Sequence, residues 1–383
     1  MTTANWQEPD LIHWSFSHVD EILATATIER AEGPVAHLPS APVDLSRVPV
    51  LGPYGEPLTV TDVVRATDTD AWLVLHHGRI LAEEYADTTT AETRHLLQSV
   101  SKTLVGAVLG ALVGQGAIDP ARTVGTYVPD LADRGYGTAT VRQVLDMRSG
   151  MGFREDYLDP HSDSRILEAI TGWAPLPNGV APSTIRRFVG GLQQTRPHGG
   201  LFDYRSCETD VLGLVCEDAT GERFPELAHR VLWSPIGAAD DALICVDDDG
   251  TGVFDGGVCA TLRDLARFGA MIISDGISLT GARVLPGGWV EDVFTGGPDS
   301  AEAFAVAAVA NEMPGGHYRS QLWMPSAGSD VALALGIHGQ LMYLDRRLGL
   351  VGVKLSSWPE PSNTWKSGAA IAIFGAIGRA LER

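Results

Sequence analysis

The chain has 383 residues, of which 44% are apolar and 20% are charged, and its formal net charge is −20. This composition is ordinary for a globular protein and excludes disordered and fibrous chains. The acidic balance disfavours nucleic acid and membrane surfaces as partners, because their phosphate groups would repel it. Since the length exceeds the roughly 250–300 residues that one core supports, we expect two packed units that share a cleft.

The start of the chain has no basic segment followed by an apolar run, so we expect no secretory signal and a cytoplasmic protein. The four cysteines, Cys207, Cys216, Cys245 and Cys259, form neither a C-x-x-C pair nor a zinc-finger pattern with histidines. We therefore predict mostly buried free thiols and no metal site.

In chain order, the residues at 1–60 are rich in Pro and Gly and predict an extended segment with one short helix at about 18–26. Two β-prone runs broken at a glycine predict a hairpin over 72–85. Apolar residues at helical spacing, with Ala and Gly on the other faces, predict a helix over 99–115 that is buried nearly all round. Short helical patterns and loops then alternate over 140–250.

Strand character returns at 339–356, where two β-prone arms flank a turn, and a final helix is predicted over 364–381. The resulting fold class is α/β (α+β), with an antiparallel β-sheet flanked by helices. We predict an α/β domain built from residues 1–115 and 251–383, an inserted mainly helical domain at 116–250, and the active site in the cleft between them.

Ser99 and Lys102 form a Ser-x-x-Lys pair at the start of the predicted buried helix. Side chains at i and i+3 share one helix face, so the hydroxyl and the amine can meet. The chain has only three lysines, Lys102, Lys354 and Lys366, so a chance pairing is uncommon. Burial should lower the pKa of Lys102 and let it take the Ser99 proton, while free N–H groups at the helix start favour an oxyanion. The alternative is a plain helix cap with a solvated lysine.

Two segments resemble the shared core of class C β-lactamases, DD-peptidases and related esterases, the penicillin-recognising serine hydrolases. They are Leu97-Gln-Ser-Val-Ser-Lys-Thr103 and Val141-Arg-Gln-Val-Leu-Asp-Met-Arg-Ser-Gly-Met151, and the resemblance runs from about residue 70. The chain is closer still to the 6-aminohexanoate-dimer hydrolases, which are nylon-oligomer amidases. The segments that carry this likeness are Trp6-Gln-Glu-Pro9, Glu155-Asp-Tyr-Leu-Asp-Pro160, Gly336-Ile-His-Gly-Gln340 and Lys354-Leu-Ser-Ser-Trp-Pro359. A β-lactamase/transpeptidase-like fold is implied.

The resemblance implies Ser99 as nucleophile, with Lys102 and Tyr204 as general base and acid. Tyr204 and Ser206 match the family's Tyr-x-Ser motif, and the nearby lysine charge should favour the Tyr204 phenolate. The family's Lys-Thr-Gly strand is replaced by Ile337-His-Gly-Gln340, which removes the charge that grips a β-lactam carboxylate. The backbone N–H groups of Ser99 and Ile337, or of a neighbour of Ile337 within 336–340, would form the oxyanion hole.

Four further residues are implied as substrate contacts. Tyr157 matches a tyrosine that caps the cleft, and Glu168 stands where the amidases carry an acidic residue facing the substrate's ammonium end. Ser206 and His338 complete the set. Glu168 is equally compatible with an exposed position on a helix surface. His338 is equally compatible with the role of a packed strand residue.

We therefore expect a serine hydrolase that cleaves linear amides, such as 6-aminohexanoate dimer, and short-chain carboxylic esters through an acyl-enzyme on Ser99. We expect no cofactor, and the expected partner is the small-molecule substrate. The sequence is also compatible with a homodimer. The alternatives are a carboxylesterase or D-amino-acid peptidase with little nylon-oligomer activity, and a non-hydrolysing binder of peptides or small acids.

Overall fold

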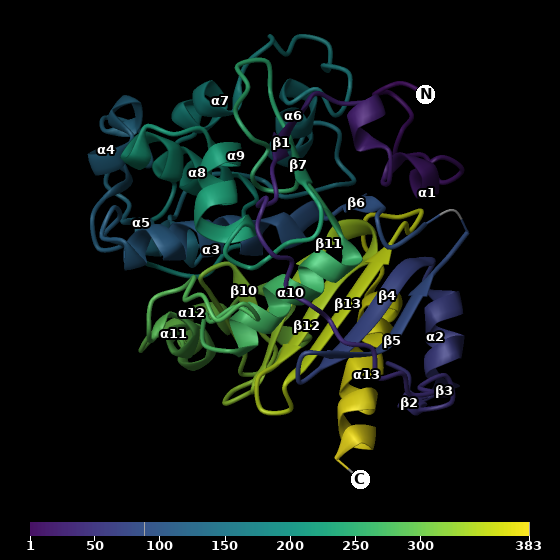
Figure 1. The fold of residues 1–383 in the computed structure, drawn as a ribbon. Coiled ribbons are helices and arrows are strands. Elements are labelled where there is room, and N and C mark those ends of the chain that lie inside the picture. Colours follow the sequence, from purple (N-terminus) through teal and green to yellow (C-terminus); the bar gives the residue numbers. More distant parts are fainter. Residues whose placement is uncertain (88, 383) are drawn as a thin grey trace.

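The computed structural model describes residues 1–87 and 89–382, and its centre is a seven-stranded sheet (Figure 1). The order is β5-β4-β13-β12-β11-β10-β9, with every neighbouring pair antiparallel. The strands are β4 (Thr69–His76), β5 (Arg79–Tyr85), β9 (His317–Arg319), β10 (Leu322–Met324), β11 (Val331–Gly336), β12 (Gln340–Asp345) and β13 (Leu350–Ser356). Both predicted hairpins and the antiparallel sheet drawn from both chain ends are confirmed.

The two faces of this sheet are covered by different helices. Successive side chains of β4 alternate, as a pleated strand requires. Leu73 belongs to the core that contains α10 (Leu262–Ile273), whereas Trp72 and Val74 belong to the core that contains α13 (Thr364–Leu381). The predicted final helix is therefore confirmed, and it packs on the sheet.

The middle of the chain is mainly helical, as predicted, and gathers above the sheet in Figure 1. Its α-helices are α4 (Val124–Tyr127), α5 (Val141–Leu145), α6 (Asp163–Ile170), α7 (Ile185–Gly191), α8 (Cys207–Thr220) and α9 (Phe224–Ala228). The buried helix α3 (Ser101–Gly114) packs against α8. The domain boundaries given above stay a prediction.

A second, four-stranded sheet joins the beginning of the chain to the middle. Its order is β1-β7-β8-β6, formed by β1 (Thr25–Ile28), β7 (Ala242–Cys245), β8 (Val258–Thr261) and β6 (Arg94–Leu96). The predicted helix at 18–26 is wrong, because α1 (Ile12–Ser15) and a 3-10 turn (Val19–Glu21) precede β1 instead. The run Thr25-Ala-Thr-Ile28 is rich in β-branched residues, and its pairing with β7 decides its structure.

The remaining elements lie around these two sheets: β2 (Pro49–Leu51), β3 (Pro57–Thr59), α2 (Val60–Ala66), α11 (Trp289–Thr295) and α12 (Ser300–Phe304). The four cysteines are buried and free, as predicted. None of the helices in the described part of the chain is long and apolar enough to cross a membrane.

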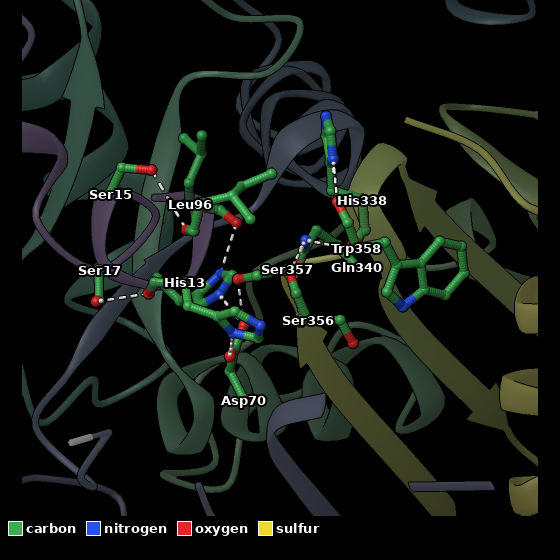
Figure 2. A network of polar contacts seen from close by, with 12 residues as sticks. His13, Ser15, Ser17, Asp70, Leu96, His338, Gln340, Ser356, Ser357 and Trp358 are labelled. Carbon is green, nitrogen blue, oxygen red and sulfur yellow. Dashed lines mark hydrogen bonds and ion pairs between the residues drawn. The ribbon is translucent and has the colours of Figure 1, made fainter. Parts of the chain in front are cut away.

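A buried carboxylate ties the N-terminal segment to the sheet (Figure 2). Asp70 on β4 is 5% exposed and contacts His13 Nδ1 at 2.6 Å and His95 Nε2 at 3.0 Å. Ser357, after β13, also donates its hydroxyl to Asp70. Burial acts to raise the pKa of Asp70, but these hydrogen bonds outweigh it and hold the pKa well below its usual range. One ionised group thus joins three separate segments.

We expect Asp70→Asn to lower the free energy of unfolding by about 3 kcal/mol at pH 7, because an amide nitrogen cannot accept these hydrogen bonds. Since the Asp70 pKa is lowered on folding, the wild-type advantage is present above the ordinary aspartate pKa and shrinks as the pH falls. Urea unfolding at several pH values measures both effects. Asp68→Asn, which removes a partly exposed carboxylate nearby, serves as the control. Equal stability of wild type and Asp70→Asn at pH 7 would contradict the expectation.

Candidate active site

The predicted Ser-x-x-Lys contact is present at the start of a buried helix. Ser99 lies in a 3-10 turn, η2 (Gln98–Val100), that leads directly into α3. Lys102 occupies the first turn of α3 and is 1% exposed, and its Nζ lies 2.8 Å from Ser99 Oγ. The i to i+3 spacing therefore brings the amine and the hydroxyl together.

The Lys102 amine has further partners around it. Its Nζ donates to the Asp255 carbonyl oxygen at 2.5 Å and lies 5.4 Å from the centre of the Tyr204 ring. Burial acts to lower the Lys102 pKa, but Tyr204 and the carboxyl groups of Asp255, Glu155 and Asp210 outweigh burial and raise it. The predicted lowering of the Lys102 pKa is thus wrong, and the resting amine is an ammonium.

Tyr204 stands on the other side of this ammonium. Its ring stacks on Trp323, with centroids 5.2 Å apart. Burial raises the pKa of Tyr204, and the Lys102 charge only partly opposes this. The expected phenolate is therefore wrong for the resting protein, and Tyr204 holds a proton that it can donate.

Asp210, on α8, fixes the carbonyl that binds Lys102. One of its carboxylate oxygens accepts the N–H groups of Phe254 and Asp255 at 3.0 and 3.2 Å, which orients the backbone at Asp255. Burial raises the pKa of both Asp210 and Asp255. Sequence reasoning missed both acids, although a charged residue among the apolar side chains of 211–216 was a signal for Asp210.

A small cavity of about 30 Å³ lies beside Ser99. Tyr157, Glu168, Ser206 and Ile337 all line it, so four of the predicted residues meet Ser99 at one place. Tyr204 instead borders a separate and larger hollow that is lined by Phe202 and Trp323. The Ser99 oxygen therefore has space on one side and a protonated phenol near the other.

Glu155 joins two of these residues. Its carboxylate accepts the Ser206 N–H at 2.8 Å and the Ser206 hydroxyl at 2.6 Å, and the Tyr157 hydroxyl also donates to it. Burial raises the pKa of Tyr157 well above its usual value. Glu155 was not singled out from the sequence, although it lies two residues before Tyr157 in a segment that carried the resemblance.

Glu168, on α6, faces the cavity and is already paired. Its Oε2 lies 2.5 Å from Arg165 Nη1, one turn earlier on the same helix. Burial raises the pKa of Glu168 to about 7, and the Arg165 charge opposes that rise. The carboxyl group thus changes charge near neutral pH, and the surface alternative for Glu168 is wrong.

The end of β11 lies close to the turn that contains Ser99. A Cβ added at Gly336 would come within 2.8 Å of the Leu97 carbonyl oxygen, so only glycine allows this approach. Ile337 follows in a short 3-10 turn, η6 (Ile337–Gly339), where His338 has the left-handed angles φ 58° and ψ 17°. This kink separates β11 from β12 beside the cavity.

His338 is not among the residues that line the cavity. Its ring is buried against Phe16, with centroids 5.4 Å apart, and its Nδ1 bonds the Trp358 carbonyl at 2.7 Å (Figure 2). Burial lowers its pKa to about 4, so the ring is neutral. His338 thus packs at the turn and fixes it, and its contact with substrate stays a prediction.

Gln340 holds the same turn from inside the sheet. Its Nε2 donates to the carbonyls of Ser356 at 2.6 Å and His338 at 3.2 Å, and its Oε1 accepts the Ser356 N–H at 3.1 Å. The side chain is 1% exposed. These bonds support the left-handed conformation of His338 and hence the position of Ile337.

Ser99 should react faster with an electrophile as the pH rises, because Lys102, whose pKa is raised, must lose a proton to act as a base. We expect a fluorophosphonate probe to label Ser99, with a rate that climbs between pH 7 and 9. Lys102→Ala and Lys102→Arg should slow labelling by much more than tenfold. The matched control is Lys366→Ala, which removes a lysine of α13. Circular dichroism checks the fold. A labelling rate that stays flat over this range, or survives in both Lys102 variants, would remove the lysine from the chemistry.

Comparisons with known proteins agree with this geometry. The Beta-lactamase family model matches residues 60–373. The chain is 38% identical, over 100% of its length and 94% of the relative, to a 6-aminohexanoate-dimer hydrolase of Paenarthrobacter ureafaciens. A Bacillus anthracis protein provisionally called a 6-aminohexanoate-dimer hydrolase has 26% identity and a TM-score of 0.90, covering 100% and 97% of the two chains. A family VIII carboxylesterase shares the fold, with 16% identity, a TM-score of 0.60 and coverage of 84% and 96%.

Proposed function

We propose that this chain, a hydrolase that belongs to the beta-lactamase family, cleaves linear amides such as 6-aminohexanoate dimer, and short carboxylic esters, through an acyl-enzyme on Ser99. The observation that carries the proposal is the 2.8 Å contact between the Lys102 amine and the Ser99 hydroxyl at a buried helix start. The cavity beside Ser99 gives the carbonyl carbon a place to approach.

In this mechanism Ser99 Oγ bonds to the carbonyl carbon and gives up its proton to Lys102 once that amine is neutral. The backbone N–H groups of Ser99 and Ile337 stabilise the negative oxygen of the intermediate. The C–N bond then breaks, and Tyr204 supplies the proton that the leaving nitrogen needs and regains one from the Lys102 ammonium beside it. Water attacks the acyl-enzyme, which releases the acid and restores the Ser99 hydroxyl.

The substrate class rests on the named relative and on Glu168. A carboxylate in the cavity wall can pair with the ammonium end of an amino-acid amide, although Arg165 competes for it. A β-lactam substrate is disfavoured, because Ile337 and His338 stand where β-lactamases carry a lysine. Lys354 cannot replace that lysine, since it is fully buried and donates to the Thr67 carbonyl. A cytoplasmic location and a homodimer stay predictions from the sequence.

Purified protein should hydrolyse both 6-aminohexanoate dimer and a p-nitrophenyl butyrate ester, and the ester should give a burst of nitrophenol. Ser99→Ala should lose both activities and the burst. Turnover of the ester alone would favour the carboxylesterase or D-amino-acid peptidase alternative. The absence of turnover and burst in wild type would overturn the hydrolase proposal and leave a non-hydrolysing binder.

Glu168→Gln should raise KM for the amine-bearing amide at pH 8 at least tenfold and leave KM for the neutral ester within about twofold. The reason is that only the amide presents a charge to Glu168. Because the Glu168 pKa is about 7, its carboxylate is charged above that pH, so wild-type KM for the amide should fall as the pH rises from 6 to 8. Steady-state kinetics on both substrates measure this. Equal changes for amide and ester would remove Glu168 from ammonium binding.

A further inference from the structure

Glu168 belongs to the wall between two cavities. It lines the small cavity beside Ser99, and it also lines an outer hollow of about 410 Å³ that the N-terminal residues Thr3–Pro9 border. Trp173 is the other residue that lines both cavities. The Glu168 side chain therefore stands between the space beside the reacting serine and a larger space on its far side.

Arg165 reaches Glu168 from the outer hollow. Arg165 lines this hollow and is not among the residues that line the Ser99 cavity, and its side chain is 33% exposed against 16% for Glu168. Its Nη1 lies 2.5 Å from Glu168 Oε2. Within the described residues, the other carboxylate oxygen, Oε1, accepts no hydrogen bond. Arg165 thus occupies one oxygen and leaves the second available to another cation.

Arg165 also offsets the negative groups around Glu168. Burial raises the pKa of Glu168, and the carboxyl groups of Asp255 and Glu155 add to that rise. The Arg165 guanidinium opposes it through its charge and its hydrogen bond. Among the described residues that line the two cavities, Arg165 is the only basic one, whereas Glu8 and Asp255 add further acids. Without Arg165, we expect the Glu168 carboxyl group to hold its proton at neutral pH.

We propose that Arg165 is a positioning residue for substrate recognition: bound to Oε2 from the outer hollow, it keeps Glu168 ionised and leaves Oε1 to the ammonium end of an ω-aminoacyl group. The inference rests on the proposed function and gives a role to a residue that does not itself touch the substrate. The guanidinium and the ammonium repel each other across the carboxylate, so Arg165 enables binding and also weakens it. Its net effect therefore depends on pH, because Glu168 ionises without help once the pH is high enough.

The test compares two matched ligands on the Ser99→Ala protein, where no turnover intervenes. One ligand is 6-aminohexanoate dimer, and the other is N-hexanoyl-6-aminohexanoate, which lacks only the amine. Isothermal titration calorimetry between pH 6 and 9 gives the ratio of their Kd values. At pH 8 we expect the dimer to bind at least tenfold more tightly. This preference should fall as Glu168 takes up a proton near its pKa of about 7.

Arg165→Gln in the same protein should move this pH dependence upward by about one pH unit. At pH 7 the preference for the dimer should fall at least fivefold, and at pH 9 it should equal or exceed that of the Ser99→Ala parent. Arg165→Lys keeps the charge and should restore most of the pH dependence. Arg230→Gln is the matched control, because it removes a partly exposed arginine that pairs with Glu222 at 2.7 Å and lines neither cavity.

An unchanged pH dependence in Arg165→Gln would overturn the inference. So would a preference that rises at every pH, which would make Arg165 a competitor only, or one that falls equally at every pH, which would indicate a structural role. If the Ser99→Ala parent shows no preference for the dimer, ammonium recognition fails and the role of Arg165 fails with it. A Ser99-dependent burst of the wild type with the butyrate ester reports the hydrolase mechanism separately, so the two proposals can fail independently.

Discussion

The buried ammonium of Lys102 is the constraint on which the rest of the site depends. A charge with 1% exposure needs compensation, and here it is provided by the Ser99 hydroxyl, the Asp255 carbonyl, the face of the Tyr204 ring and nearby carboxyl groups. These partners come from several separate parts of the chain, so holding the charge also assembles the site. The same compensation makes the amine a weaker base, because stabilising the ammonium opposes its loss of a proton.

A second constraint is the backbone at Ile337. It must lie beside Ser99, and this depends on the close approach of Gly336 to Leu97 and on the left-handed His338. Gln340 and the ring of His338 hold the turn through bonds to the carbonyls of Ser356 and Trp358. The sheet that supplies these residues therefore acts as the rigid support for a site whose proposed nucleophile, Ser99, lies in the turn that leads into α3.

Much of the fold and the Ser99–Lys102 pair follow from the sequence, because they depend on local spacing. The hairpins, α3 and α13 can each be predicted from the pattern of residues within their own segment. The features that sequence reasoning missed depend on contacts between distant segments. β1 forms because Ala242–Cys245 pairs with it, and the Lys102 pKa is raised by acids such as Asp210 that only the fold brings near. Likewise, the ring of His338 turned out to pack against Phe16, which no local pattern indicates.

The position of Trp6 has a consequence for biosynthesis. Its indole donates to the carbonyl of Trp173, which lies 167 residues further along the chain. Similarly, β1 cannot pair until β7 has been synthesised. At about 5–20 residues per second, the first segment leaves the ribosome on the order of ten to thirty seconds before that partner exists. During this interval its apolar residues lack their native partners, so the hollow lined by Thr3–Pro9 and Trp173 forms only after nearly half of the chain has been made.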